Sequence, residues 1–222
     1  MMDEIIAEIE EHLEKAKKRA KLTNKDVLKV QSGIYFENHL DHLIRIYLGK
    51  MNEYLKASKE PKEFKNVLKT DFIDNVLFNY FKSNKLWDLE LEDMLKDRER
   101  IQNLGDTLLD KVYKGLPLRT LLKQQKGTVG LYTDLEIFNK IIETTPLIFP
   151  KISGNKALLV NLIMKDYFLK SCEMSKESFV SNSKGIAEML NYKFTDKHFQ
   201  NYFKIDKLTN DNFKNTPIVK LS

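Results

Sequence analysis

The sequence predicts a mainly α-helical protein, with a bundle-like N-terminal part and a small helix-turn-helix or winged-helix-like C-terminal part. Three observations support this class. The 222 residues are 42% apolar, enough for a sizeable core, and only five prolines and eight glycines interrupt a chain rich in leucine, lysine and glutamate. Apolar residues recur at three-to-four spacing, and the excess positive charge lies in the last third of the chain.

The N-terminal part is expected to form long helices with short connections. The first covers about residues 3–22, and a second runs from an N-cap at Asn24 to about residue 55, with a bend at Gly33. The segment "SKEPKEF" predicts the start of a third helix, because proline is tolerated in the first helical turn. A fourth is expected over residues 86–114, before a glycine and a proline. Such helices are typical of a bundle.

The helical pattern weakens between residues 116 and 132, where "KGTVGLY" is compatible with a short strand. Thr133 is then expected to cap a helix over "DLEIFNKIIE". Two prolines in "TTPLIFPKISGN" place the predicted domain boundary at about residue 150. Residues 1–150 would form a scaffold for oligomerisation or signal input, and residues 151–222 would form a DNA-binding domain.

A buried helix over about residues 155–170 is expected to precede the segment "SNSKGIAEMLNYKFTDKHFQNYF", residues 181–203. This segment reads as two short helices, with Asn191 ending the first and Thr195 capping the second. Either a DNA-reading helix-turn-helix or an ordinary pair of packed helices fits the pattern. The side chains expected to face inward are Ile186, Ala187, Leu190, Phe199, Tyr202 and Phe203.

The second helix, residues 196–204, is expected to expose residue types that bind DNA. Lys197, Gln200 and Asn201 would lie nearest the bases, because lysine pairs with guanine and the two carboxamides pair with adenine. His198 is expected to be exposed beside them. The phosphate contacts are expected from Lys184, Lys193, Lys204 and Lys207.

Charge supports the same division of the chain. Residues 151–222 contain 12 lysines and 7 acidic residues, whereas residues 1–150 contain 25 basic and 25 acidic residues. A basic segment attached to a neutral one is typical of a phosphate-binding module on a scaffold.

Other functional classes find little support in the sequence. His39 and His42 are three residues apart near Glu37 and Asp41, but a metal site needs three or four convergent ligands. The single Cys172 forms no internal disulfide, and no base or orienting group is evident for a nucleophilic role. We therefore predict a non-enzymatic protein without a cofactor, metal or small-molecule substrate.

The location is predicted from the apolar segments. The N-terminus has no long apolar run of the kind found in secretory signals, and the run Ala157–Met164 is far shorter than the roughly 20 residues needed to span a membrane. We expect a cytoplasmic protein that does not enter membranes.

Three stretches resemble RteC-type regulatory proteins of bacterial conjugative transposons. They are "EFKNVLKTDFIDNVLFNYFK", "LKDRERIQNLGDTLLDKVYKG", and "SGNKALLVNLIMKDYFLKS" leading into "KGIAEMLNYKFTDKHFQNYFKI". The similarity covers about half of the chain, mainly as hydrophobic pattern, and stops around residues 116–150. It implies a helical N-terminal part, a C-terminal DNA-binding part and control of excision genes.

Two functions therefore stay open. The first is a DNA-binding transcriptional regulator of a mobile element, which would bind double-stranded DNA and could be a homo-oligomer. The alternative is a helical protein-interaction module of a mobile element or phage, an inhibitor or adaptor, suggested by the neutral, aromatic-bearing first two thirds.

Overall fold

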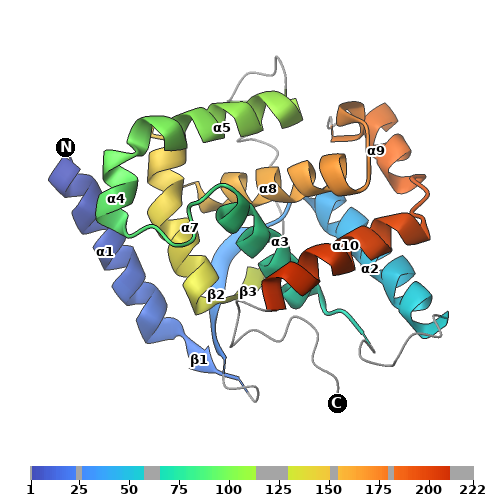
Figure 1. The fold of residues 1–222 in the computed structure, drawn as a ribbon, viewed down its shortest axis with the longest axis horizontal. Coiled ribbons are helices and arrows are strands. Elements are labelled where there is room, and N and C mark those ends of the chain that lie inside the picture. Colours follow the sequence, from blue (N-terminus) through green and yellow to red (C-terminus); the bar gives the residue numbers. More distant parts are fainter. Residues whose placement is uncertain are drawn as a thin grey trace.

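Helices surround one small antiparallel sheet (Figure 1). The computed structural model describes residues 2–23, 27–57, 66–113, 130–150, 155–179 and 183–210. The mainly helical class is confirmed. The elements in chain order are α1 Met2–Arg19, β1 Lys21–Leu22, β2 Leu28–Tyr35, α2 Asn38–Ala57, α3 Lys69–Ser83, α4 Leu91–Lys96, α5 Arg98–Tyr113, β3 Gly130–Asp134, α7 Leu135–Ile148, α8 Lys156–Ser171, the 3₁₀ turn η1 Lys176–Phe179, α9 Ser183–Leu190 and α10 Asp196–Asn210.

The sheet contains three strands in the order β1-β2-β3. Its central strand β2 occupies part of the predicted second helix, which is therefore wrong over Leu28–Tyr35. Val30, Ser32 and Ile34 are buried while the residues between them face outward, and this period of two is that of a strand. The expected N-cap, Asn24, lies outside the described residues. The strand predicted near "KGTVGLY" corresponds to β3.

The other helices differ from prediction mainly at their ends. The expected fourth helix is divided at Asp97 into α4 and α5, and α3 begins only at Lys69. The "SKEPKEF" start lies outside the described residues. Asp134, not Thr133, caps α7, because its carboxylate accepts a hydrogen bond from the Glu136 amide.

Helix α7 also continues through Pro146 to Ile148. Leu147 and Ile148, which follow the proline, are both buried. Burial of two large aliphatic side chains, worth about 1.5–3 kcal/mol each, offsets the roughly 3 kcal/mol cost of proline in a helix. The proline therefore does not end the helix.

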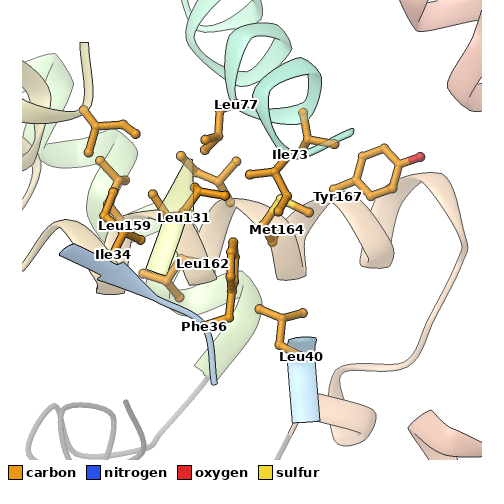
Figure 2. Close-up of a cluster of buried hydrophobic side chains, with 14 of the residues drawn as sticks. Ile34, Phe36, Leu40, Ile73, Leu77, Leu131, Leu159, Leu162, Met164 and Tyr167 are labelled. Atoms are coloured by element: carbon orange, nitrogen blue, oxygen red, sulfur yellow. The ribbon is translucent and has the colours of Figure 1, made fainter. Parts of the chain in front are cut away.

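Helix α8 lies at the centre of the molecule (Figure 1). Every residue from Leu158 to Phe168 is buried, which confirms the predicted buried helix. It packs against α3, α5, α7 and β2. Figure 2 shows the resulting core, in which Ile34 and Leu131 of the sheet meet Ile73 and Leu77 of α3 and Leu159 and Leu162 of α8.

Buried residues on both sides of residue 150 contribute to one hydrophobic cluster. Helix α10 packs on α2 and α3, far before it in sequence, as well as on α8. The division of the chain at about residue 150 stays a prediction, and residues 151–154 lie outside the described structure. Among the described helices, none combines the length and apolar character needed to cross a membrane.

A buried carboxylate connects the sheet to α3. The Lys29 amine donates to Oδ1 of Asp71 and Oδ2 of Asp74, each at 3.2 Å, and the Asp134 amide donates to the same oxygen of Asp74 at 3.2 Å. Burial, aided by the nearby Asp134 charge and only partly opposed by Lys29, raises the pKa of Asp74 to about 7. This group therefore titrates near neutral pH.

Candidate nucleic-acid interface

Aromatic side chains fix α10 to the body of the protein. Phe199 and Tyr202 are buried, as predicted. The Phe199 ring lies 5.5 Å from the ring of Tyr47 on α2, and the Tyr202 ring lies 5.5 Å from that of Phe72 on α3, both centroid to centroid. Such aromatic pairs add to the stabilisation from burial alone. The inner side of α10 is thus packed against α2 and α3.

His198 is buried, with 7% of its surface exposed, so the prediction that it lies on the exposed face is wrong. Its Nδ1 accepts a hydrogen bond from the Thr195 amide at 3.0 Å, and its own amide donates to the Thr195 carbonyl oxygen at 2.9 Å. This exchange resembles a capping box, in which the third helical residue reaches back to the cap. The Thr-x-x-His spacing was the sequence signal for this role.

The imidazole of His198 must be neutral at Nδ1 to accept that bond. Burial lowers the pKa of His198, which favours the neutral form. The ring packs near Tyr192 and Phe194. His198 therefore stabilises the start of α10.

The outer side of α10 carries the predicted polar face. Lys197 and Gln200 are exposed and Asn201 is half-buried. Residues at positions i, i+3 and i+4 lie on the same side of a helix, so the three form one surface. The Gln200 amide lies 3.4 Å from the Tyr54 hydroxyl, a weak contact. Lys204 and Lys207 follow on α10, but the structure does not describe their side chains.

The remaining predicted lysines lie close to this surface in sequence. Lys193 is exposed in the connection between α9 and α10, and Lys184 is exposed on α9. Lys184 has Glu188 at 3.9 Å, and Lys197 donates to Glu173 at 3.0 Å. The hydrogen bond from Lys197 lowers the pKa of Glu173. Because exposed ion pairs are weak, either lysine can exchange its carboxylate partner for a phosphate.

Helix α9 differs from the prediction. Gly185 and Met189 are its buried residues, Ile186 is half-buried, and Ala187 and Leu190 are exposed. The long apolar side chain of Met189 faces inward, where it removes more apolar surface from water than Ala187 would. Helix α9 packs mainly on η1 and α2, whereas α10 packs on α2, α3 and α8. The prediction that Ala187 and Leu190 face inward is therefore wrong.

A buried ionic cluster lies near the middle of the molecule and was missed from the sequence. The Lys165 amine donates to both Glu37 oxygens, at 2.8 and 2.7 Å, and the Tyr113 hydroxyl donates to Glu37 at 3.0 Å. His39 Nε2 lies 2.8 Å from the same carboxylate. Although burial opposes ionisation, hydrogen bonds from His39 and Lys165 hold the pKa of Glu37 below its usual range.

The geometry gives this cluster a structural role. Lys165 and Glu37 are almost completely buried, whereas His42, three residues after His39, is exposed on α2. Over the described parts of the chain, no three His, Cys, Asp or Glu side chains are placed to hold a metal ion. Cys172 is buried, and burial raises the pKa of its thiol, which keeps it protonated and unreactive.

None of the protein-family models, curated proteins or solved structures compared with this chain matches it. The resemblance to RteC-type regulators stays a prediction from the sequence. Function has to be argued from the chemistry of particular sites, because a fold alone does not define it.

Proposed function

We propose that this protein is a non-enzymatic transcriptional regulator that binds double-stranded DNA through the outer side of α10. The observation that carries the proposal is the two-sided character of this helix. Phe199 and Tyr202 fix one side to α2 and α3, while Lys197, Gln200 and Asn201 share the other. A helix packed in this way and carrying these side chains suits the major groove, where lysine and carboxamides recognise base edges.

The proposed docking places α10 in the groove and lysines on the flanking phosphates. Lys193 and Lys184 precede the helix and are exposed, and Lys204 and Lys207 follow within it. The body would present α10 through α2, α3 and α8, in a variation on a helix-turn-helix or winged helix. The N-terminal helices would then serve oligomerisation or signal input in the cytoplasm.

The first experiment is a mobility-shift titration of the full chain on the duplex upstream of its own coding sequence and on a random duplex of equal length. At about 50 mM salt we expect tighter binding to the upstream duplex, with affinity falling steeply by about 200 mM because phosphate contacts release counterions. Equal binding to both duplexes would remove the site-specific role. Binding to neither would remove the proposal.

A second candidate function, a protein-interaction module, is favoured by apolar side chains exposed on the sheet. Leu22 of β1 is 64% exposed and lies opposite Leu28 of β2, and Tyr132 of β3 is 51% exposed. Exposed apolar groups of this size can mark an interaction surface. Replacing Leu22 and Tyr132 by serine should remove partner capture and leave DNA binding unchanged. Unchanged capture would contradict this candidate.

A further inference from the structure

A cavity of about 110 Å³ lies between α3, α8 and the inner side of α10. This is smaller than the apolar cavity of about 150 Å³ that holds one benzene ring in another protein, so the space takes at most one small ring or a short chain. The side chains that matter for its chemistry are Asn79, Tyr80, Asp166, Tyr167, Lys170 and Tyr202.

Among the described residues that line this cavity, Asp166 and Lys170 form an ion pair with unequal partners. The Asp166 side chain is 6% exposed, whereas that of Lys170, one helical turn later, is 58% exposed and donates to Oδ2 of Asp166. The carboxylate is fixed in the wall, and the amine stands at the mouth on a flexible chain. A buried carboxylate needs a cationic or hydrogen-bonding partner, but that partner does not have to be Lys170.

Three tyrosines line the same space, from α3, α8 and α10. Burial, and then the charge of Asp166, raises the pKa of Tyr80, and burial raises that of Tyr167 well above its usual range. These phenols are therefore neutral, and their ring faces attract cations. In Figure 2 the Tyr167 hydroxyl points away from the labelled aliphatic side chains of the core.

We propose that this cavity binds a small organic cation, a primary amine carrying one ring or a short chain, whose ammonium group replaces that of Lys170 at the Asp166 carboxylate. The amine would donate to Asp166, the rings of Tyr80 and Tyr202 would surround its apolar part, and Lys170 would turn outward into water. A carboxylic acid of the same size would be repelled, because its negative charge would lie beside the Asp166 carboxylate.

Tyr202 connects the cavity to α10, because it lines the cavity and belongs to this helix. It is buried on the inner side of the helix, two residues after Gln200 on the outer side. A ligand at this position would fill the space between α10 and the body, and would so affect how firmly α10 is held. This regulatory consequence rests on the proposed function, whereas amine binding does not.

The test is calorimetric titration of the full chain, without DNA, with benzylamine and with benzyl alcohol, which match in size and differ in charge at neutral pH. We expect saturable binding of benzylamine that is at least about tenfold tighter than that of the alcohol, since a charge-assisted bond to a buried carboxylate exceeds a neutral one by this order. Asp166→Asn should abolish this preference.

Lys170→Gln should change the affinity for benzylamine in the opposite direction to Asp166→Asn. Because it removes the competing ammonium group, it should tighten benzylamine binding several-fold, while Lys96→Gln, which alters an exposed lysine on α4 paired with Asp93, should change nothing. Equal binding of the two probes, retained preference in Asp166→Asn, or no binding of benzylamine would overturn the proposal. If Asp166→Asn does not fold, as judged by circular dichroism, unchanged or weaker binding to Lys170→Gln overturns it.

Discussion

Two lysine–glutamate pairs in this protein have the same chemistry and different surroundings. Lys165 and Glu37 lie 2.7 Å apart with side chains 0% and 1% exposed, and Lys197 and Glu173 lie 3.0 Å apart with both side chains 67% exposed. Removal of one buried partner leaves an uncompensated charge, whereas water solvates whatever remains of an exposed pair. The first pair supports the fold, and the second is available to a partner.

The number of lysines in a segment does not measure how basic its surface is. Lys165 is one of the 12 lysines in residues 151–222, but it is enclosed and neutralised by Glu37. Only the exposed lysines can attract a phosphate. The charge excess therefore overstates the basic surface, and single substitutions can separate the two kinds of lysine.

The largest effect is expected from Lys165→Met. It leaves Glu37 buried without its cation, and we expect a loss of about 3–5 kcal/mol in the free energy of unfolding, measured by urea denaturation. The matched change Lys197→Met should leave the free energy of unfolding unchanged within experimental error. Similar losses in the two variants would show that burial does not separate the pairs.

The next largest effect is expected in the pH dependence of the free energy of unfolding, through the buried carboxylate of Asp74. Asp74 has a folded-state pKa of about 7, above the ordinary value of 3.8, so the folded state holds an extra proton between these values. Its contribution to stability is present below about pH 4 and is lost as the pH rises towards 7, with a slope approaching about 1.4 kcal/mol per pH unit. Asp74→Asn should remove this slope.

The control for Asp74→Asn is the change Glu173→Gln, at an exposed carboxylate. Urea denaturation at several pH values should give the same profile for Glu173→Gln as for the unchanged protein. Carboxylates with a lowered pKa, such as Glu37, make the free energy of unfolding rise with pH, opposite to Asp74. The difference between the pH profiles of the unchanged protein and of Asp74→Asn therefore isolates the contribution of Asp74. A profile unchanged by Asp74→Asn would contradict the assignment.

A smaller effect is expected at the start of α10. His198→Ala removes the acceptor of the Thr195 amide and should cost about 1 kcal/mol, typical of a helix cap. Because burial lowers the pKa of His198, its contribution should be present above about pH 6.5 and lost as the pH falls. His42→Ala, at an exposed position on α2, is the control. Equal effects would argue against the capping role.

The smallest effect on stability is expected from Glu173→Gln, because this residue is exposed and its pair with Lys197 is weak. Its effect on DNA binding should be measurable, since Lys197 is then free to bind a phosphate or base. We expect a several-fold gain in affinity for the upstream duplex by fluorescence anisotropy. A loss of affinity would contradict the placement of Lys197 at the interface.

The sequence predicted the parts of the molecule that depend on local pattern. The first helix is confirmed as far as Arg19, although Lys21 and Leu22 form β1, and the buried α8 and the inward Phe199 and Tyr202 are confirmed. Strand β2 was missed because its apolar residues also fit a helical spacing, and its partner β3 is about 100 residues away. Local pattern does not reveal such pairing.

The same limit applies to the sites. The pairing of Glu37 with Lys165 and the position of Asp166 beside tyrosines of α3 and α10 arise from packing between distant segments. His198 was misplaced because helical position alone was considered, without its reach back to Thr195. The Thr-x-x-His spacing was a usable signal for His198. No local pattern indicated the Glu37–Lys165 pair or the position of Asp166.

The most direct test of the central claim is the affinity for the upstream duplex of the unchanged protein and of a variant with Lys197, Gln200 and Asn201 replaced by alanine. We predict that site-specific binding is lost while the free energy of unfolding stays the same, because these side chains lie on the outer side of α10. Retained specific binding by the folded variant would show that α10 does not read DNA.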